Sequence, residues 1–452
     1  MRTTRHTRNT ANARFIVRSA SILNPRNSSE NLLNQIENLS VRDLADALVA
    51  EKVCYRILDL LGRHKSVVVK ELMEDSIFSA HITRINLVAD KTSMLLNTLN
   101  EAGCRSEIPI LAIKGLCARE YYADPQLRDM GDIDLMVRSV DDAIRLIQVL
   151  RELGYTFERR ELPWLKRDLA TGNLYGQFNL KFSQLNGSPN IDIHFGGYSV
   201  RHCGLLGFKK ENLKSGISYL SLLENIPFLV GNAAGDHKIT TKDLNDLYIS
   251  LDINSEDWDR IIAELDSVAL LPFFNIMLCN LKQWSSLSSS QSSRVEGILN
   301  TTQPEWPKPG LFLSWQRRWL AISKHAFKLS VRYSYHQAII AAFTATRYYW
   351  KPLQLVVVKR NPRSISRMPS LNPWTCIRLV PVELLERIMS KSDNKPIGMP
   401  SLKVTGPTKA ISSELSIIQS SHGDVVRSRV GDFLPTVFYD LDNKLLELAD
   451  RC

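Results

Sequence analysis

The sequence predicts an α+β (mixed α/β) fold, in which a small mixed sheet is flanked by helices and the N-terminal and C-terminal regions are helical. Residues 108–137 combine a buried strand (109–113), a Lys-Gly turn, a short helix and a second strand. In contrast, residues 30–103 and 216–285 place apolar residues at helical spacing. Strand-forming and helix-forming segments are therefore combined in one chain, as a sheet covered by helices requires.

Length and composition are those of a soluble globular protein. A chain of 452 residues predicts two or three domains, and 44% apolar and 23% charged residues are ordinary values. No apolar run reaches the roughly 18 residues that cross a bilayer, and the N-terminus lacks the apolar core of a signal peptide. The seven cysteines are scattered, without a Cys-x-x-Cys pair, which predicts a reduced, cytoplasmic protein without a zinc cluster.

Charge is distributed unevenly along the chain. The net charge is +10, but residues 1–29 contain six arginines and residues 306–382 contain thirteen Lys or Arg, and neither stretch has an acid. These two stretches carry +19, so the remainder carries −9. This asymmetry predicts an anionic partner: nucleic acid, an acidic or phosphorylated substrate, or an anionic membrane surface.

We predict five regions from these patterns. They are a disordered basic tail (1–29), an N-terminal helical region (30–105), a catalytic core (106–200), a helical substrate-binding region (201–290) and, after a Ser-rich linker (286–304), a basic C-terminal region (305–452) that is helical and then partly loopy.

Within residues 106–200, local signals place the elements around the predicted sheet. Ser139 is expected to cap a helix that ends at Gly154, as Gly103 is expected to end the helix before the core. Residues 175–195 are expected to form a hairpin around Asn186-Gly187, and residues 163–174 a helix or loop.

Three aspartates are the candidate catalytic and metal-binding residues. Asp132 and Asp134 alternate along one strand and therefore share a face, where they repel each other. Asp192 has the same alternating setting in the second strand of the hairpin. Carboxylates on neighbouring strands can hold one or two Mg²⁺ (or Mn²⁺) ions, although exposed aspartates at a strand end need no metal. His194, on the face of Asp192, is expected either to orient it or to be structural.

The same residues resemble a known family. Gly115, Asp132-Ile133-Asp134 and Asp192 resemble the pattern of the polymerase beta-like nucleotidyltransferase superfamily. The fuller string, Leu111-x-x-Lys114-Gly115, Tyr121/Tyr122, Arg128 and Gly131-Asp132-Ile133-Asp134-Leu135, is similar to the uncharacterised bacterial nucleotidyltransferase family often found near peptide natural-product genes. The similarity covers about residues 108–250. It departs from the superfamily in having Gly115-Leu116 instead of Gly-Ser or Gly-Gly, and in a longer gap, with Asp132 17 positions after Gly115.

The resemblance implies a reaction and a substrate. A nucleoside monophosphate would pass from an NTP, expected to be ATP, to a hydroxyl or other acceptor on a small molecule or peptide, with release of pyrophosphate. It implies metal binding by the three aspartates, and phosphate contacts by Lys114 and Arg128. Gly115 would let the backbone approach a phosphate.

A second segment resembles the same family. Residues 235–247 have the form His…Lys-Asp-Leu-x-Asp-Leu, which implies nucleotide or second-substrate contacts by His237, Lys242 and Asp246. The alternative is a solvated helix with a Thr cap.

Two other functions stay open from the sequence. The missing Ser after Gly115 motivates a non-catalytic nucleotide-binding or scaffold protein. The basic segments, in particular the aromatic and basic residues of 312–350, motivate an RNA-directed nucleotidyltransferase; a helical core with solvated charges is the structural alternative there.

Overall fold

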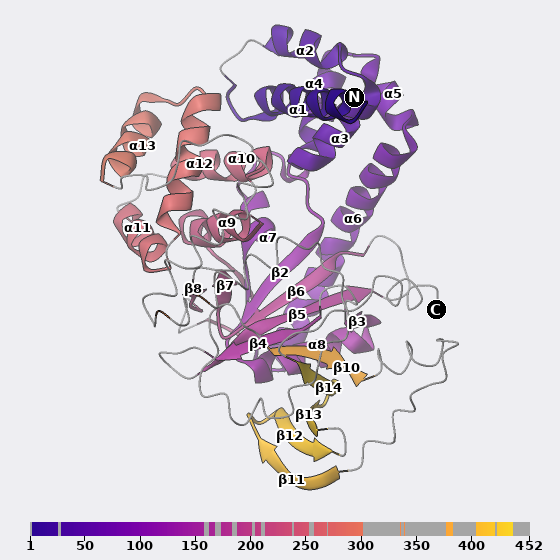
Figure 1. Cartoon of the computed structure of the whole chain (residues 1–452), viewed down its shortest axis with the longest axis vertical. Helices are drawn as coiled ribbons and strands as arrows, with labels where there is room; N and C mark the ends of the chain where they lie inside the picture. Colours follow the sequence, from indigo (N-terminus) through magenta and orange to yellow (C-terminus); the bar gives the residue numbers. More distant parts are fainter. Residues whose placement is uncertain are drawn as a thin grey trace.

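The computed structural model describes residues 2–25, 29–157, 162–167, 173–182, 188–200, 204–208, 213–236, 239–252, 257–268, 270–301, 335, 339, 377–382, 404–420 and 423–436. A twisted mixed sheet forms the centre, with one group of helices from the N-terminal region and another from residues 222–301 (Figure 1). The predicted α+β class is confirmed.

Helices fill the N-terminal region, as predicted. They are α1 (Arg2–Ser21), α2 (Ser29–Glu37), α3 (Val41–Glu51), α4 (Cys54–Arg63), α5 (Val68–Glu74) and α6 (Ser76–Arg105). The apolar faces of these helices share one core that includes Leu44, Leu48 and Phe78. Gly103 lies inside α6 and does not end it: a Cβ there would lie 3.0 Å from the Cα of Gly216, so the glycine permits close packing.

The structure differs from the predicted disordered tail at residues 1–29, because residues 2–21 form α1. Ala13, Ile16, Val17 and Ala20 recur at helical spacing and are buried in the N-terminal core. The low apolar content of the whole stretch conceals this narrow apolar face.

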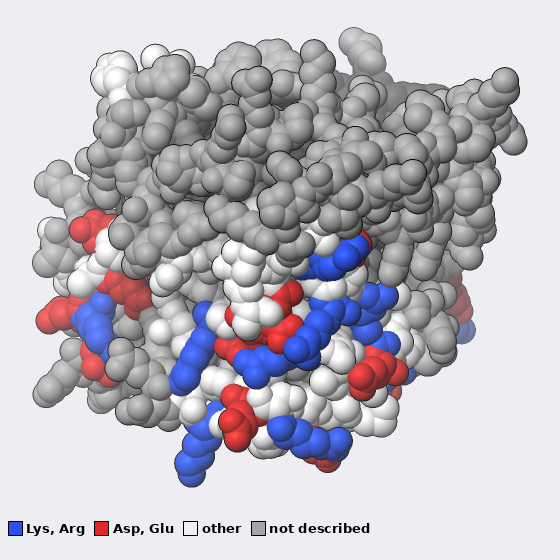
Figure 2. All heavy atoms as spheres, turned by 90° about the horizontal axis from the view of Figure 1, so that it is seen from below, with Lys and Arg blue, Asp and Glu red and all other residues white. Residues whose placement is uncertain are grey.

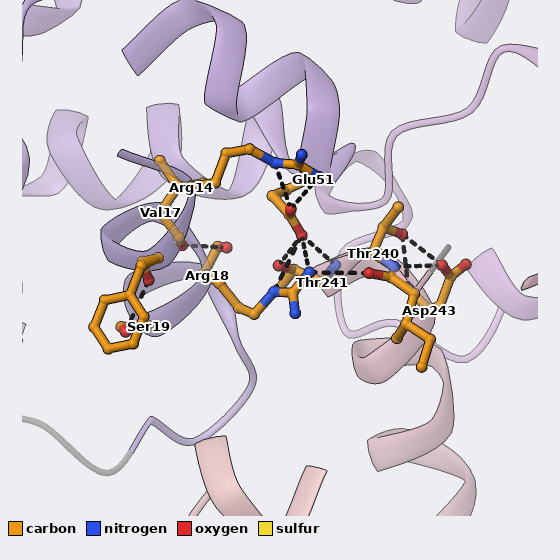
Figure 3. Close-up of polar contacts among 11 residues, drawn as sticks. Arg14, Val17, Arg18, Ser19, Glu51, Thr240, Thr241 and Asp243 are labelled. Atoms are coloured by element: carbon orange, nitrogen blue, oxygen red, sulfur yellow. Dashed lines mark hydrogen bonds and ion pairs between the residues drawn. The ribbon is translucent and has the colours of Figure 1, made fainter. Parts of the chain in front are cut away.

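Polar contacts also fix α1. The buried Glu51 carboxylate accepts hydrogen bonds from Arg14 (2.9 Å) and Arg18 (2.9 Å), and from the backbone N–H and hydroxyl of Thr241 (both 2.9 Å), as Figure 3 shows. We call Arg14, Arg18, Glu51 and Thr241 the Glu51 cluster. It joins α1, α3 and the start of α10 (Thr241–Leu251).

The central sheet mixes parallel and antiparallel strands. Its order is β11-β12-β13-β14-β10-β4-β5-β6-β2-β1-β9, and β3 pairs with β5. The strands that residues 106–200 give to this sheet are β1 (Pro109–Ala112), β2 (Asp132–Val137), β3 (Tyr155–Phe157), β4 (Trp164–Arg167), β5 (Leu174–Phe182) and β6 (Asn190–Phe195). A further strand, β9 (Gly216–Tyr219), comes from the region that was expected to be helical and pairs with β1. β2 runs parallel to β6 and antiparallel to β1. The hairpin of β5 and β6 is confirmed, whereas its turn (183–187) lies outside the described residues.

The two faces of this sheet have different cores. Ile133 and Leu135 of β2 pack in a core that includes α6 and α8 (Val140–Glu152), and the predicted Ser139 cap of α8 is present. The opposite core contains Leu111 and Met136 and takes in a group of helices and a two-stranded sheet. These elements are α7 (Lys114–Arg119), α9 (Leu222–Asp236), α11 (Trp258–Ser267), α12 (Leu271–Trp284), α13 (Ser289–Thr301), β7 (Tyr198–Val200) and β8 (Gly204–Leu206), together with α10.

Two loop predictions differ from the structure. Residues 164–167, expected in a helix or loop, form β4 because they pair with both β5 and β10. The Ser-rich stretch expected as a linker (286–304) contains the whole of α13, whose Val295 and Ile298 are buried. In both places tertiary pairing overrides a weak local signal.

The C-terminal strands extend the sheet, although this region was expected to be helical and then partly loopy. They are β10 (Ile377–Pro381), β11 (Val404–Ala410), β12 (Leu415–Ser420), β13 (Gly423–Ser428) and β14 (Gly431–Thr436). Val426 of β13 and Phe433 of β14 are buried in the core beneath α8. This burial, together with the pairing of β13 with β14, explains why the two segments form strands. The sheet is consequently larger than the small one predicted.

Charges of both signs mix on the lower face of the molecule over the residues that Figure 2 colours. In the C-terminal strands and their turns, Arg427 pairs with Asp432 at 2.9 Å and Arg429 with Glu414 at 2.9 Å. Most of the acid-free stretch 306–382 lies outside the described residues, so its role stays a prediction. Across the described part of the chain, we find no helix with the length and apolar character needed to span a membrane.

Candidate active site

Two aspartates meet at the centre of the sheet. In the parallel pairing of β2 with β6, Asp134 stands opposite Asp192, and the next pair along the same face is Met136 with His194. Paired residues on neighbouring strands point to the same face. Ligand atoms of Asp134, Asp192 and His194 accordingly lie within 4.8 Å of one another. We call these three residues the acidic cluster.

Lys114 reaches the cluster from the start of α7. Its Nζ lies 2.6 Å from Oδ1 of Asp134 and 4.7 Å from the ring centroid of Tyr198. Nε2 of His194 lies 3.4 Å from the same Oδ1. Because a carboxylate offers about four lone pairs on two oxygens, Asp134 can accept these contacts and still bind a cation.

The electrostatics keep the cluster in a form that suits metal ligation. Burial alone would raise the pKa of Asp134, but the Lys114 ammonium and the His194 hydrogen bond lower it below its usual range. Burial lowers the pKa of His194 to about 4, and the positive charge of Lys114 also lowers it. The hydrogen bond to Asp134 and the charge of Asp134 act in the opposite direction. At neutral pH the imidazole is therefore uncharged, as a metal ligand must be.

The donor set fits a divalent cation. Asp134 and Asp192 offer oxygen ligands of the kind that Mg²⁺ and Mn²⁺ prefer, and a neutral imidazole is a good ligand for Mn²⁺ and later transition metals. Counting Lys114, Asp134, Asp192 and a neutral His194, the group carries a net charge of −1. A bound cation would offset the remaining repulsion between the two carboxylates.

Asp132 lies on the same face but outside this tight group. It is the first residue of β2, pairs with Asn190 in register and is exposed. It stands one pleat away from Asp134, at the solvent end of the strand. The structure thus brings Asp134 and Asp192 together at the centre and leaves Asp132 at the edge.

Arg128, Gly115 and Asp246 form a second group. The Arg128 guanidinium makes a bidentate ion pair with Asp246, at 2.9 and 2.8 Å, and both side chains are almost fully buried. The Tyr122 hydroxyl donates to the same carboxylate at 2.7 Å. A Cβ at residue 115 would lie only 2.7 Å from Nη1 of Arg128, so Gly115 makes room for the arginine. These contacts join the segment between α7 and β2 to α10.

Lys242 lies next to this group on α10. It is half-buried, and burial lowers its pKa, as do the nearby positive charges of Arg128 and Lys52. Lys242 and Asp246 are four residues apart and share a helix face. His237, the third residue predicted from this segment, lies outside the described residues.

Sequence reasoning left the role of His194 open and did not single out Tyr198 or Asn225. The alternation Asp192-Ile193-His194 was a signal for the histidine, since it puts both polar side chains on one strand face. Neither Tyr198 nor Asn225 has such a local signal, because each reaches Lys114 only through the tertiary fold.

The fold and the cluster define the class of protein: a nucleotidyltransferase. Residues 39–286 match the sequence model of a family described as uncharacterised nucleotidyltransferase. The match covers more than half of the chain, and the protein belongs to this family. The matched segment begins before α3 and ends after α12, so it includes helices α3 to α6, the strands of the acidic cluster and helices α9 to α12. No curated protein matches the chain in sequence.

Proposed function

We propose that the protein transfers a nucleoside monophosphate from an NTP, with ATP as the expected donor, to a hydroxyl or other nucleophile on a small molecule or peptide. The observation that carries the proposal is the placement of Asp134 opposite Asp192, with His194 within ligand distance, in a chain of a nucleotidyltransferase family. Two carboxylates side by side repel each other, and a bound cation would offset that repulsion.

The roles follow from the positions of the side chains. Asp134 and Asp192, with His194 or with the more exposed Asp132, would hold Mg²⁺ or Mn²⁺. When bound, such an ion lowers the pKa of an attacking hydroxyl and neutralises charge on a triphosphate. Asp192 is less buried than Asp134, and we propose it as the acceptor of the hydroxyl proton. Lys114 would supply a point charge to the phosphates from beside the carboxylates.

We propose that the other residues predicted for nucleotide binding take part in it: Gly115, Arg128, His237, Lys242 and Asp246. The structure supports an indirect role for Arg128, because Asp246 and Tyr122 hold it beside Gly115. Lys242 is the more direct candidate for a phosphate contact: it is half-buried and repelled by the positive charges around it.

The test is metal-dependent pyrophosphate release from NTPs, with mass spectrometry of candidate small-molecule and peptide acceptors. We expect Asp192→Asn to lower turnover by about 10³-fold or more, the order of effect seen when catalytic charge stabilisation is lost. Asp141→Asn is the matched control, since this partly buried carboxylate is hydrogen-bonded to Ser412 and Ser413, away from the cluster. Full turnover in Asp192→Asn would refute the proposal.

A non-catalytic nucleotide-binding protein is the second candidate, and one contact favours it. Lys114 already neutralises Asp134 at 2.6 Å, so the buried carboxylate has a cationic partner of its own. This candidate predicts NTP binding without pyrophosphate release under any metal. Release by the wild-type protein would exclude it.

An RNA acceptor is a third possibility that the charge distribution motivates. It predicts RNA binding that weakens steeply as salt rises, because phosphate contacts release counterions. Absence of such binding would leave the small-molecule or peptide acceptor.

We further propose that the protein works in a reducing compartment, the cytoplasm. Cys54, Cys104, Cys117 and Cys279 are free thiols in the described part of the structure, which supports this proposal.

A further inference from the structure

The backbone of Lys114 has an unusual conformation. Its φ is +52°, in the left-handed region, which is unfavourable for a residue with a Cβ. The other non-glycine residues with positive φ in the described ranges, Asn24, Lys52, Lys65 and Glu107, are all exposed, whereas Lys114 is buried. A glycine would remove the strain, but it could not supply the ammonium.

Asn225 holds this conformation. It lies in the first turns of α9, and its side chain is fully buried. Its Oδ1 accepts a hydrogen bond from the Lys114 N–H at 2.7 Å, and its Nδ2 donates to the Lys114 carbonyl at 2.9 Å. Only this orientation of the amide satisfies both contacts, because a backbone N–H requires an acceptor and a carbonyl requires a donor.

Neighbouring contacts fix Asn225 itself. Its backbone N–H bonds to the Ser221 carbonyl at 3.0 Å, and the Ser221 and Glu224 side chains cap this helix end reciprocally. The preceding Leu220 carbonyl accepts from Cys117 of α7. The start of α9 is therefore a rigid support against the start of α7.

We propose that Asn225 is a positioning residue of the active site, which holds the Lys114 backbone so that its ammonium points at Asp134. The direction in which a side chain leaves the backbone is set by φ and ψ, so this pair of hydrogen bonds fixes the direction from which the Lys114 side chain approaches Asp134. The position of Lys114 is a property of the fold alone; its consequence for turnover rests on the proposed function.

The chain contains a matched control for this role. Asn245, on α10, is also buried, and its amide makes the same pair of backbone contacts: it accepts from the Leu23 N–H at 2.7 Å and donates to the Ser21 carbonyl at 3.0 Å. Asn225→Ala and Asn245→Ala each remove two such hydrogen bonds from a buried helix residue. The two variants differ in the backbone that loses its partner: Lys114 in Asn225→Ala, and Ser21 and Leu23 in Asn245→Ala.

The first experiment measures the position of Lys114 without reference to activity. The purified full-length protein is labelled with isotopic acetic anhydride, and acetylation of each lysine is followed by mass spectrometry. We expect Asn225→Ala to speed the labelling of Lys114 by about tenfold or more, as loss of two hydrogen bonds predicts, and Asn245→Ala to leave it within twofold. Asn225→Asp keeps the acceptor but not the donor, and we expect an intermediate increase. Labelling of Lys114 that is equal in all variants would overturn the proposal.

The second experiment measures turnover. We expect Asn225→Ala to lower kcat by about 10²-fold, the cost of misplacing a catalytic group, and Asn245→Ala to change it less than threefold at a similar loss of melting temperature. In a Lys114→Ala background, Asn225→Ala should have no further effect on kcat. An equal loss of kcat in both single variants would overturn the positioning role. A wild-type protein without turnover would refute the proposed function, and the labelling result would still decide the position of Lys114.

Discussion

Two buried carboxylate sites in this protein are built in opposite ways. In the Glu51 cluster, hydrogen-bond donors reach both oxygens of one carboxylate: two from Arg14, two from Arg18 and two from Thr241 (Figure 3). In the acidic cluster, the contacts of Lys114 and His194 both fall on Oδ1 of Asp134, and a second carboxylate stands opposite. The first site has more positive than negative charge, and the second has the reverse.

This difference separates a structural site from a functional one. Glu51 joins three elements that are far apart in the sequence, and burial with complete pairing is what a structural ion pair needs. The acidic cluster leaves carboxylate lone pairs and a net negative charge at the centre of the sheet. Asp134 stands opposite Asp192 with His194 within ligand distance, so this is the place where we expect a cation and a triphosphate.

The largest expected effect on stability is at Glu51. Glu51→Ala leaves the buried Arg18 without its carboxylate, and we expect the free energy of unfolding to fall by about 3–5 kcal/mol. Turnover per folded molecule should stay near the wild-type value. Urea unfolding with parallel assays measures both. Glu71→Ala, on an exposed face of α5, is the control and should change stability by less than about 0.5 kcal/mol. A Glu51→Ala protein as stable as this control would contradict the structural assignment.

The pH dependence of stability should separate the two sites. Burial lowers the pKa of His194 to about 4, below the unfolded value near 6.5, so unfolding binds a proton in this window. Stability should therefore fall by roughly 3 kcal/mol as the pH drops from about 6.5 to 4. His194→Asn should remove most of this slope, as measured by unfolding at a series of pH values.

Glu51 should act in a lower pH range. Burial alone would raise its pKa, but Arg18 and Arg14 lower it below the ordinary value. Its stabilising contribution is thus complete above about pH 4.3 and is lost as the pH falls through the lowered value. Glu51→Gln should remove this acid-range slope and leave the slope above pH 4.3 unchanged. An unchanged acid-range slope would contradict the pairing.

A smaller effect is expected at Gly115, where the structure favours packing against Arg128 over an approach to phosphate. Gly115→Ala puts a Cβ at 2.7 Å from Nη1 of Arg128, and we expect a loss of about 1–3 kcal/mol in stability. An Arg128→Leu background should reduce that cost, which a double-mutant cycle measures. A Gly115→Ala protein with wild-type stability and weakened NTP binding would instead favour the phosphate role.

The sequence predicted correctly those features that depend on residues close together in the chain. Alternation placed Asp134 and Asp192 on strands, and their pairing follows from the hairpin and the parallel strand beside it. The Ser139 cap and the helices of residues 30–105 follow from side chains close in sequence.

The remaining features depend on partners that are far apart in the chain. Asp246 lies 118 residues from Arg128, and its carboxylate takes the guanidinium that was expected to face a phosphate. The strands of residues 404–436 form because they pair with one another and cover the core under α8, which no local pattern shows. Likewise α1 is stabilised by Glu51 and a narrow apolar face, and not by average composition.

The most direct test of the central claim is Mn²⁺ binding, measured by titration calorimetry on the full-length protein without nucleotide. We predict that the wild-type protein and Asp141→Asn bind Mn²⁺ with similar affinity, and that Asp192→Asn and His194→Asn bind it at least about tenfold more weakly while staying folded. Equal binding by wild-type and Asp192→Asn proteins, or no binding by the wild-type protein, would contradict the account.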